Sequence, residues 1–196
     1  MTDADRKFRV ESDLVGEVRL PADSLSGVHT ARAVQNFGLA KRPVNRALVH
    51  AFGDVKLAAA TTNRGLGAWD GDDAKADAIE RACGEMSEGL LDEFVVVDAL
   101  QGGAGTSTNM NVNEVLANRA LVMLGQEPGE YARVSPTDDI NLNQSTNDTY
   151  PTAMHIACAE EIEHRLIPAL QKLRNALNDK AMAFAGIIKI GRTHTQ

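Results

Sequence analysis

The feature that most constrains the fold is an apolar stripe toward the C-terminal end of the sequence. Five apolar residues recur at spacings of 4, 4, 3 and 4, which places them on one face of a helix: Ile162, Leu166, Leu170, Leu173 and Leu177. The helical pattern covers roughly 30 residues, or about 45 Å, and we expect it to bend at Pro168 and to end near Gly186. A helix of that length cannot bury its apolar residues within a domain of this size. The segment therefore predicts a helical bundle that other chains complete.

The composition also favours helices. The 196 residues are 43% hydrophobic and 24% charged, which is typical of globular proteins rather than disordered chains. Aromatic residues make up only 4%, which favours closely packed helices over a β-sandwich or a barrel. The net charge of −7 argues against a surface for nucleic acid or anionic membranes.

The expected location follows from what the sequence lacks. No apolar segment near the N-terminus resembles a signal peptide, and no run approaches the roughly 18 apolar residues of a membrane span. Cys83 and Cys158 form no CxxC pattern, and we expect both to be reduced and buried. We therefore predict a soluble cytoplasmic protein.

The remaining segments predict a mainly α fold with one short hairpin. In chain order we expect a hairpin at 8–20 that turns at Gly16, a loop at 21–32, helices at 43–67 and 72–94, a tight loop at 101–108, a helix at 109–125 and a broken polar stretch at 126–144. We divide the chain into an N-terminal helical domain at 1–144 and the beginning of a long-helix bundle at 145–196.

Three polar clusters could carry chemistry: residues 105–109, 144–148 and 191–194. Each combines hydroxyl or amide side chains with a loop, and the first two precede a helix. Hydroxyls and free backbone amides at a helix N-terminus together bind a carboxylate or a developing oxyanion. The alternative is that these residues only cap the helices. The glycines lack nucleotide-binding spacing, and the five histidines lack metal-ligand spacing, so we expect no cofactor and no metal.

At these clusters the sequence resembles the aspartase and class II fumarase superfamily. The similar motifs are GGAGTSTNMNVNEVLANRA at 102–120, NLNQSTNDTYPTAMHIA at 141–157 and KIGRTHTQ at 189–196. The resemblance implies a cofactor-free β-elimination that produces fumarate from a small dicarboxylate. It also implies an N-terminal helical domain, a central bundle of very long helices, and a homotetramer whose active sites each draw on three subunits.

The resemblance also implies roles for individual residues. Ser145 and Thr146 would hold the carboxylate that becomes the aci-form, and Thr193 would bind the other carboxylate. Thr106, Asn147 and the catalytic His194 would surround the leaving amino group. The family's catalytic serine lies in a GSSxMPxKxNP loop that is absent from these 196 residues. We therefore expect an N-terminal piece that is inactive alone.

Details within the motifs favour aspartate ammonia-lyase. GGAGTS and Gln144–Asn147 (QSTN) are aspartase-like, whereas TAMHIA and GRTHTQ are fumarase-like. Fumarate hydratase and a catalytically silent helical assembly protein remain as alternatives. The silent alternative is disfavoured because a purely structural protein has no need of the hydroxyl clusters.

Overall fold

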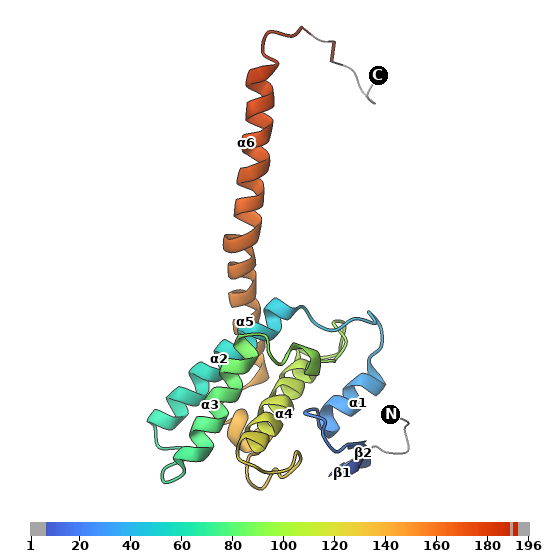
Figure 1. Ribbon diagram of the computed structural model, residues 1–196. Coiled ribbons are helices and arrows are strands. Elements are labelled where there is room, and N and C mark those ends of the chain that lie inside the picture. Colours follow the sequence, from blue (N-terminus) through green and yellow to red (C-terminus); the bar gives the residue numbers. More distant parts are fainter. Residues whose placement is uncertain (1–6, 189, 192–196) are drawn as a thin grey trace. The chain divides into compact units, whose positions relative to one another are not determined.

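The computed structural model describes residues 7–188, 190 and 191, and the chain divides into two compact units, residues 1–157 and 158–196 (Figure 1). The first unit contains both strands and most of the helices. Their bounds are β1 Phe8–Asp13, β2 Gly16–Pro21, α1 Val28–Asn36, α2 Arg46–Gly65, α3 Asp73–Ser87, α4 Thr106–Met123 and the start of α5 Thr146–Glu161. This arrangement confirms the predicted mainly α fold and the hairpin. Among the described residues, no helix is both long and apolar enough to cross a membrane.

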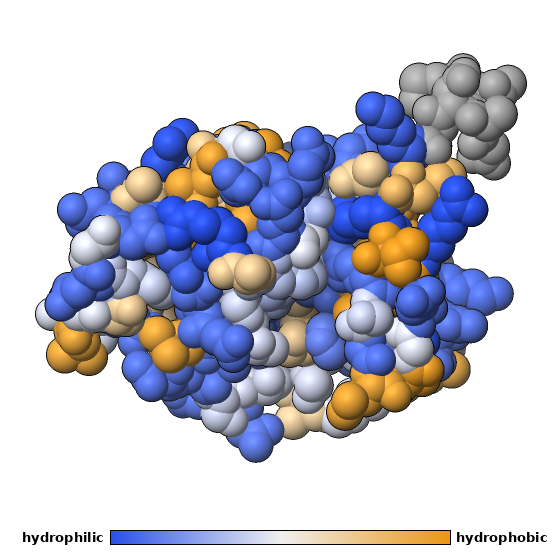
Figure 2. All heavy atoms as spheres, turned by 90° about the horizontal axis from the view of Figure 1, so that it is seen from below, coloured by the Kyte–Doolittle hydropathy of each residue, from blue (hydrophilic) through white to orange (hydrophobic). Residues whose placement is uncertain are grey.

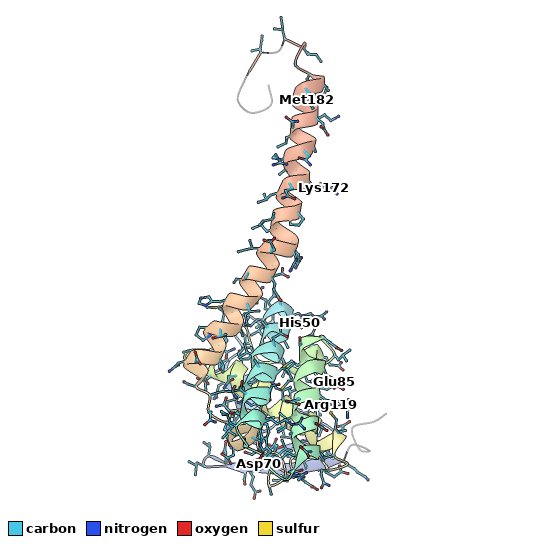
Figure 3. All side chains as sticks on the ribbon, turned by 90° about the vertical axis from the view of Figure 1, so that its left-hand side faces the viewer. His50, Asp70, Glu85, Arg119, Lys172 and Met182 are labelled. Carbon is cyan, nitrogen blue, oxygen red and sulfur yellow. The ribbon has the colours of Figure 1, made fainter. Side chains whose placement is uncertain are left out.

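The core of the first unit lies between α2, α3 and α4, which run side by side (Figure 1). Phe52 from α2, Met86 from α3 and Leu116 from α4 are all fully buried. Helix α4 is buried on nearly every side, so its polar residues also face the interior. An ion pair at the edge joins α3 to α4, with Arg119 Nη2 2.8 Å from Glu85 Oε1 (Figure 3).

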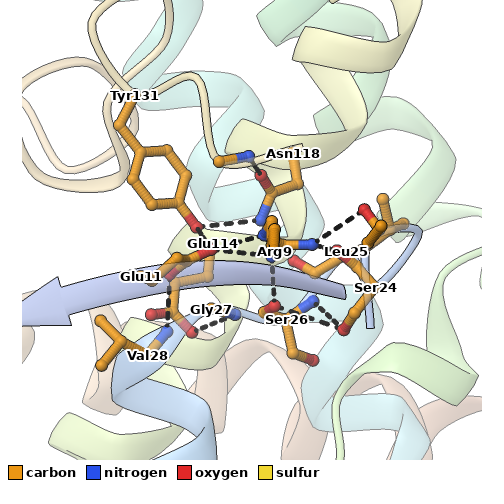
Figure 4. A network of polar contacts seen from close by, with 12 residues as sticks. Arg9, Glu11, Ser24, Leu25, Ser26, Gly27, Val28, Glu114, Asn118 and Tyr131 are labelled. Carbon is orange, nitrogen blue, oxygen red and sulfur yellow. Dashed lines mark hydrogen bonds and ion pairs between the residues drawn. The ribbon is translucent and has the colours of Figure 1, made fainter. Parts of the chain in front are cut away.

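Helix α1 differs from the prediction, which places a loop at residues 21–32. Its N-cap residue Gly27 has no side chain to cap the helix, and the cap comes instead from far along the chain. Glu114 accepts hydrogen bonds from the backbone amides of Gly27 (2.9 Å), His29 (2.8 Å) and Thr30 (3.0 Å), and Glu11 accepts one from Val28 (2.8 Å). Figure 4 shows the bonds from Gly27 and Val28. The sequence around α1 carries no local start signal, because tertiary contacts supply it.

Two further boundaries differ from the prediction. The helix expected at 72–94 ends at Ser87, where Gly89 takes a positive φ of 80° and stops it, and a short 3₁₀ turn follows at Asp92–Phe94. The polar stretch at 126–144 contains one turn of π-helix, Pro136–Ile140, which the side chain of Ser135 caps.

Seen from below, the surface is mainly hydrophilic, with apolar side chains in separate small groups (Figure 2).

The second unit contains the end of α5, a π-helical turn at Ile162–Leu166 and helix α6, Ile167–Ala183. The irregular turn ends two residues before Pro168, which cannot donate a backbone hydrogen bond, and this agrees with the predicted local distortion. Every side chain from 162 to 188 is exposed, including those of the predicted apolar stripe. Two of these exposed residues, Lys172 and Met182, are labelled in Figure 3.

The cysteine prediction was half right. Both thiols are free, and Cys83 is buried as expected. Cys158 is exposed, because the buried face of α5 is formed by Thr149, Ala153 and Ala157 and the next residue lies about 100° around the helix.

Candidate functional site

The first predicted cluster lies at the N-terminus of α4. Gly105 precedes the helix with a φ of 84°, and a Cβ at this position would lie 2.1 Å from Cδ2 of Tyr150. Only glycine therefore allows the loop to approach the start of α5 this closely. Thr106 begins α4 and is exposed, while the side chain of Gln101 accepts a hydrogen bond from the amide of Thr108 at 2.8 Å.

The second predicted cluster lies at the N-terminus of α5. The Oγ of Ser145 accepts a hydrogen bond from the amide of Asn147 at 3.2 Å, so Ser145 caps the helix. Capping uses the hydroxyl oxygen as an acceptor and leaves its proton free to be donated. Ser145 and Asn147 are both exposed, and Thr146 is half-buried. The capping role and a binding role are therefore compatible at this position.

A buried amide joins the two clusters. Asn109 Nδ2, on α4, donates to Thr146 Oγ1 at 3.0 Å, and Thr149 Oγ1 donates to Asn109 Oδ1 at 3.3 Å. The structure thus brings Thr106, Ser145, Thr146 and Asn147 to neighbouring helix N-termini within the first unit. Thr193 and His194 lie outside the described residues.

Beneath these residues lies a polar network that was not predicted. Lys56 of α2 is 1% exposed, and its Nζ donates to Asn141 Oδ1 at 3.1 Å and to Gln144 Oε1 at 2.9 Å. Burial lowers the pKa of Lys56 to about 7, because the charged ammonium loses its hydration. Asn109 and Asn113 also donate to Asn141 Oδ1, at 3.0 and 3.1 Å.

One sequence signal could have revealed part of this network. Asn109 and Asn113 are four residues apart on α4, so their amides share one helix face. Buried asparagines are costly without partners, and such a pair on one face of a helix that is buried on nearly every side indicates a polar network. Lys56 gave no such signal, since a lysine in a helix is ordinarily exposed.

The chemistry available at the site is that of neutral donors at two helix N-termini. Such an arrangement favours a carboxylate or another oxyanion, because hydroxyl protons and helix dipoles both stabilise negative charge. Across the part of the chain that the structure describes, no group of three or more His, Cys, Asp or Glu residues could hold a metal ion.

Comparison with known proteins assigns the chain to a family. The family profile described as "Lyase" matches residues 16–196. The mitochondrial fumarate hydratase of Mus musculus is 47% identical over 195 residues, covering 98% of this chain and 38% of the mouse protein. The class II fumarate hydratase of Rhizobium meliloti is 48% identical over 190 residues, covering 96% of this chain and 40% of that protein.

Solved structures agree with the sequence comparison. A fumarate lyase:delta crystallin from Brucella melitensis has a TM-score of 0.90 at 47% identity, and covers 97% of this chain and 44% of its own. The class II fumarase of Schistosoma mansoni has a TM-score of 0.84 at 37% identity, covering 97% of this chain and 40% of its own. The chain thus spans about two fifths of the length of these relatives. It belongs to the Lyase family of the fumarase and aspartase superfamily.

Proposed function

We propose that this chain forms the N-terminal part of a fumarate hydratase, a lyase that interconverts L-malate and fumarate. The motif details favour aspartate ammonia-lyase, but the named relatives are fumarate hydratases at 47–48% identity and support the alternative. L-Aspartate is therefore the second candidate substrate, supported by the QSTN and GGAGTS motifs alone.

The observation that carries the proposal is the meeting of two helix N-termini through Asn109 and Thr146 at 3.0 Å. In the elimination, the C–H bond next to one carboxylate breaks: its proton passes to a base, which the resemblance places in the family's serine loop, and its electron pair moves into the carboxylate to give a dianionic aci-carboxylate. The pair then forms the C=C bond as the hydroxyl takes up a proton and leaves as water, which yields fumarate. Stabilising the dianion is the largest demand on the site, and preorganised donors meet it.

We assign the proposed roles as follows. Ser145 and Thr146 hold the carboxylate that becomes the aci-form, and Thr106 and Asn147 lie near the departing hydroxyl. The free hydroxyl protons of Ser145 and Thr146 suit this task, because each oxygen already accepts a hydrogen bond. From the motif at 189–196, Thr193 binds the other carboxylate and His194 acts in catalysis. No cofactor takes part in this scheme.

The test is a steady-state assay on the complete gene product, which follows the ultraviolet absorbance of fumarate with L-malate or L-aspartate. We expect turnover of L-malate and little of L-aspartate. Thr146→Val should lower kcat by roughly 100-fold, the usual effect of losing one donor to an oxyanion. Thr152→Val is the matched control, because its hydroxyl bonds only to Asp148 of the same helix among the described residues. Faster turnover of L-aspartate than of L-malate would overturn the choice of substrate.

A catalytically silent protein is the other class of function, and the Brucella melitensis relative is described as a delta crystallin as well as a fumarate lyase. No turnover of either substrate by the complete gene product would support this alternative. Equal rates for the wild type and Thr146→Val would count against the proposed site even if turnover occurred.

We further propose that the apolar stripe of the second unit packs against other copies of the chain in a homotetramer. Its support is that every side chain of the stripe is exposed, with Leu166, Leu173 and Leu177 each more than half exposed. Light scattering of the complete gene product should give four times the chain mass, and the mass of a monomer would refute the proposed tetramer.

The predicted cytoplasmic location stays a prediction, and some relatives are named mitochondrial.

A further inference from the structure

Lys56 is a buried charge without a counter-ion in the part of the chain that is described. Its side chain is 1% exposed, and its hydrogen bonds go to two neutral amide oxygens, Asn141 Oδ1 and Gln144 Oε1. Burying an ammonium group is expensive, and amide dipoles offset only part of the lost hydration. A hydrophobic residue here would fold at less cost, so the lysine needs another explanation than stability.

The contacts of Lys56 lead to the helix N-termini in a definite direction. Asn141 Oδ1 receives three donors, from Lys56, Asn109 and Asn113, at 3.0 to 3.1 Å. The same Asn109 Nδ2 donates onward to Thr146 Oγ1 at 3.0 Å. Thr146 therefore receives a hydrogen bond from the interior, and its own proton is left for a partner on the outer side.

Three donors of the network share a single acceptor oxygen. A carbonyl oxygen has two lone pairs, yet three N–H groups converge on Asn141 Oδ1. Among the described residues, the buried Oδ1 of Asn113 has no partner, so its amide is oriented by donation alone. The donors that converge here, with the Nζ group of Lys56 at the inner end, give the region beneath Thr146 a positive potential, which is greatest when Lys56 is protonated.

We infer that Lys56 is a positioning residue for the carboxylate site, which it serves without touching the substrate. Its Nζ group fixes the amide of Asn141 by donating a hydrogen bond, and through Asn109 this directs the Thr146 hydroxyl outward as a donor. The inference rests on the proposed function, because it assigns Lys56 to the same anion site. The role is exerted most strongly when the carboxylate becomes doubly negative, so it should affect kcat more than KM.

The test compares two variants of α2 in the complete gene product, with L-malate as substrate. Lys56→Met keeps the length of the side chain but removes the charge and the donors. Asn63→Ala is the matched control: Asn63 binds the same loop through Leu142 and Asn143, at 3.1 Å each, but has no hydrogen bond to Asn141, Asn109 or Thr146 among the described residues. Thermal unfolding is measured beside kcat and KM.

We expect Lys56→Met to lower kcat by roughly 10- to 100-fold with KM changed less than about threefold, as for other residues that orient a binding group. Its Tm should not fall, whereas Asn63→Ala should lower Tm and reduce kcat much less. A kcat for Lys56→Met within twofold of the wild type would overturn the inference. So would parallel losses of Tm and activity in both variants, because a merely structural lysine gives that result.

Two controls keep the outcomes distinct. If the wild type acts on neither L-malate nor L-aspartate, the proposed function is wrong, and the inference falls with it. If Lys56→Met does not fold, Lys56→Gln replaces it, since glutamine keeps an N–H donor without the charge. The kcat, KM and Tm of Lys56→Gln are then judged by the same outcomes as those given for Lys56→Met.

Discussion

The cap that Glu114 provides for α1 gives the sharpest test of how this fold is held. Its carboxylate, fully buried, accepts from the amides of Gly27, His29 and Thr30 and from the Thr30 hydroxyl at 2.5 Å. In Glu114→Gln, the remaining oxygen still faces the three donors that now bind Oε2. The new NH2 group then faces the amide of His29, so two donors oppose each other where a hydrogen bond existed.

The expected cost follows from these contacts. Losing one hydrogen bond to a charged group costs about 1.5–3 kcal/mol, and removing a negative charge from a helix N-terminus costs up to about 1 kcal/mol more. Together we expect a loss of about 3 kcal/mol, which for a chain of this size lowers Tm by roughly 6–12 °C.

The assay is thermal and urea unfolding followed by far-ultraviolet circular dichroism. The matched control is Glu88→Gln, an exposed position where the same substitution should change stability by less than about 0.5 kcal/mol. If Glu114→Gln stays within that same margin, the Glu114 carboxylate does not hold the start of α1, and the idea of a long-range cap is refuted.

Three further predictions concern single residues. Between about pH 7 and pH 9 the folded chain loses the Lys56 proton that the unfolded chain keeps, so wild-type stability should rise with pH by about 2 kcal/mol relative to Lys56→Met. Parallel curves of stability against pH for the two proteins would refute the lowered pKa. Gly105→Ala should lower the free energy of unfolding, measured in urea, by at least about 2 kcal/mol, because the positive φ of Gly105 and its contact with Tyr150 both exclude a Cβ. An unchanged free energy of unfolding would contradict the close approach of Gly105 to Tyr150. A thiol reagent should modify the exposed Cys158 in the native chain of 196 residues and reach the buried Cys83 only after unfolding. Burial also raises the pKa of the Cys83 thiol to about 12, which further lowers its reactivity. Fast reaction of both thiols in the native chain would contradict this prediction.

The sequence predicted those parts of the fold whose signals are local. The hairpin turning at Gly16 and the helices at the core follow from patterns that neighbouring residues create. The start of α1 could not be predicted, because Glu114 lies more than 80 residues away from the amides that it caps. The end of α3 was missed although Gly89 carried a signal for it, since apolar periodicity continued past it.

The candidate site was predicted at its surface and missed beneath it. Thr106, Ser145, Thr146 and Asn147 were proposed as candidates because hydroxyl and amide residues before a helix are a visible pattern. The support for Thr146 was not visible, because Lys56 is three helices away in sequence. Hydrogen bonds between distant segments depend on how the helices pack, so they produce no regular residue spacing that could be recognised in the sequence.

The distant cap also has a consequence for synthesis on the ribosome. Gly27 and Thr30 leave the exit tunnel more than 80 residues before Glu114. At a translation rate of about 5–20 residues per second, this gap is roughly 4–17 s. Throughout that interval the nascent segment 28–36 has no carboxylate from Glu114 to begin its helix. The start of α1 therefore cannot acquire this cap until α4 has been synthesised, after α2 and α3 have already left the ribosome.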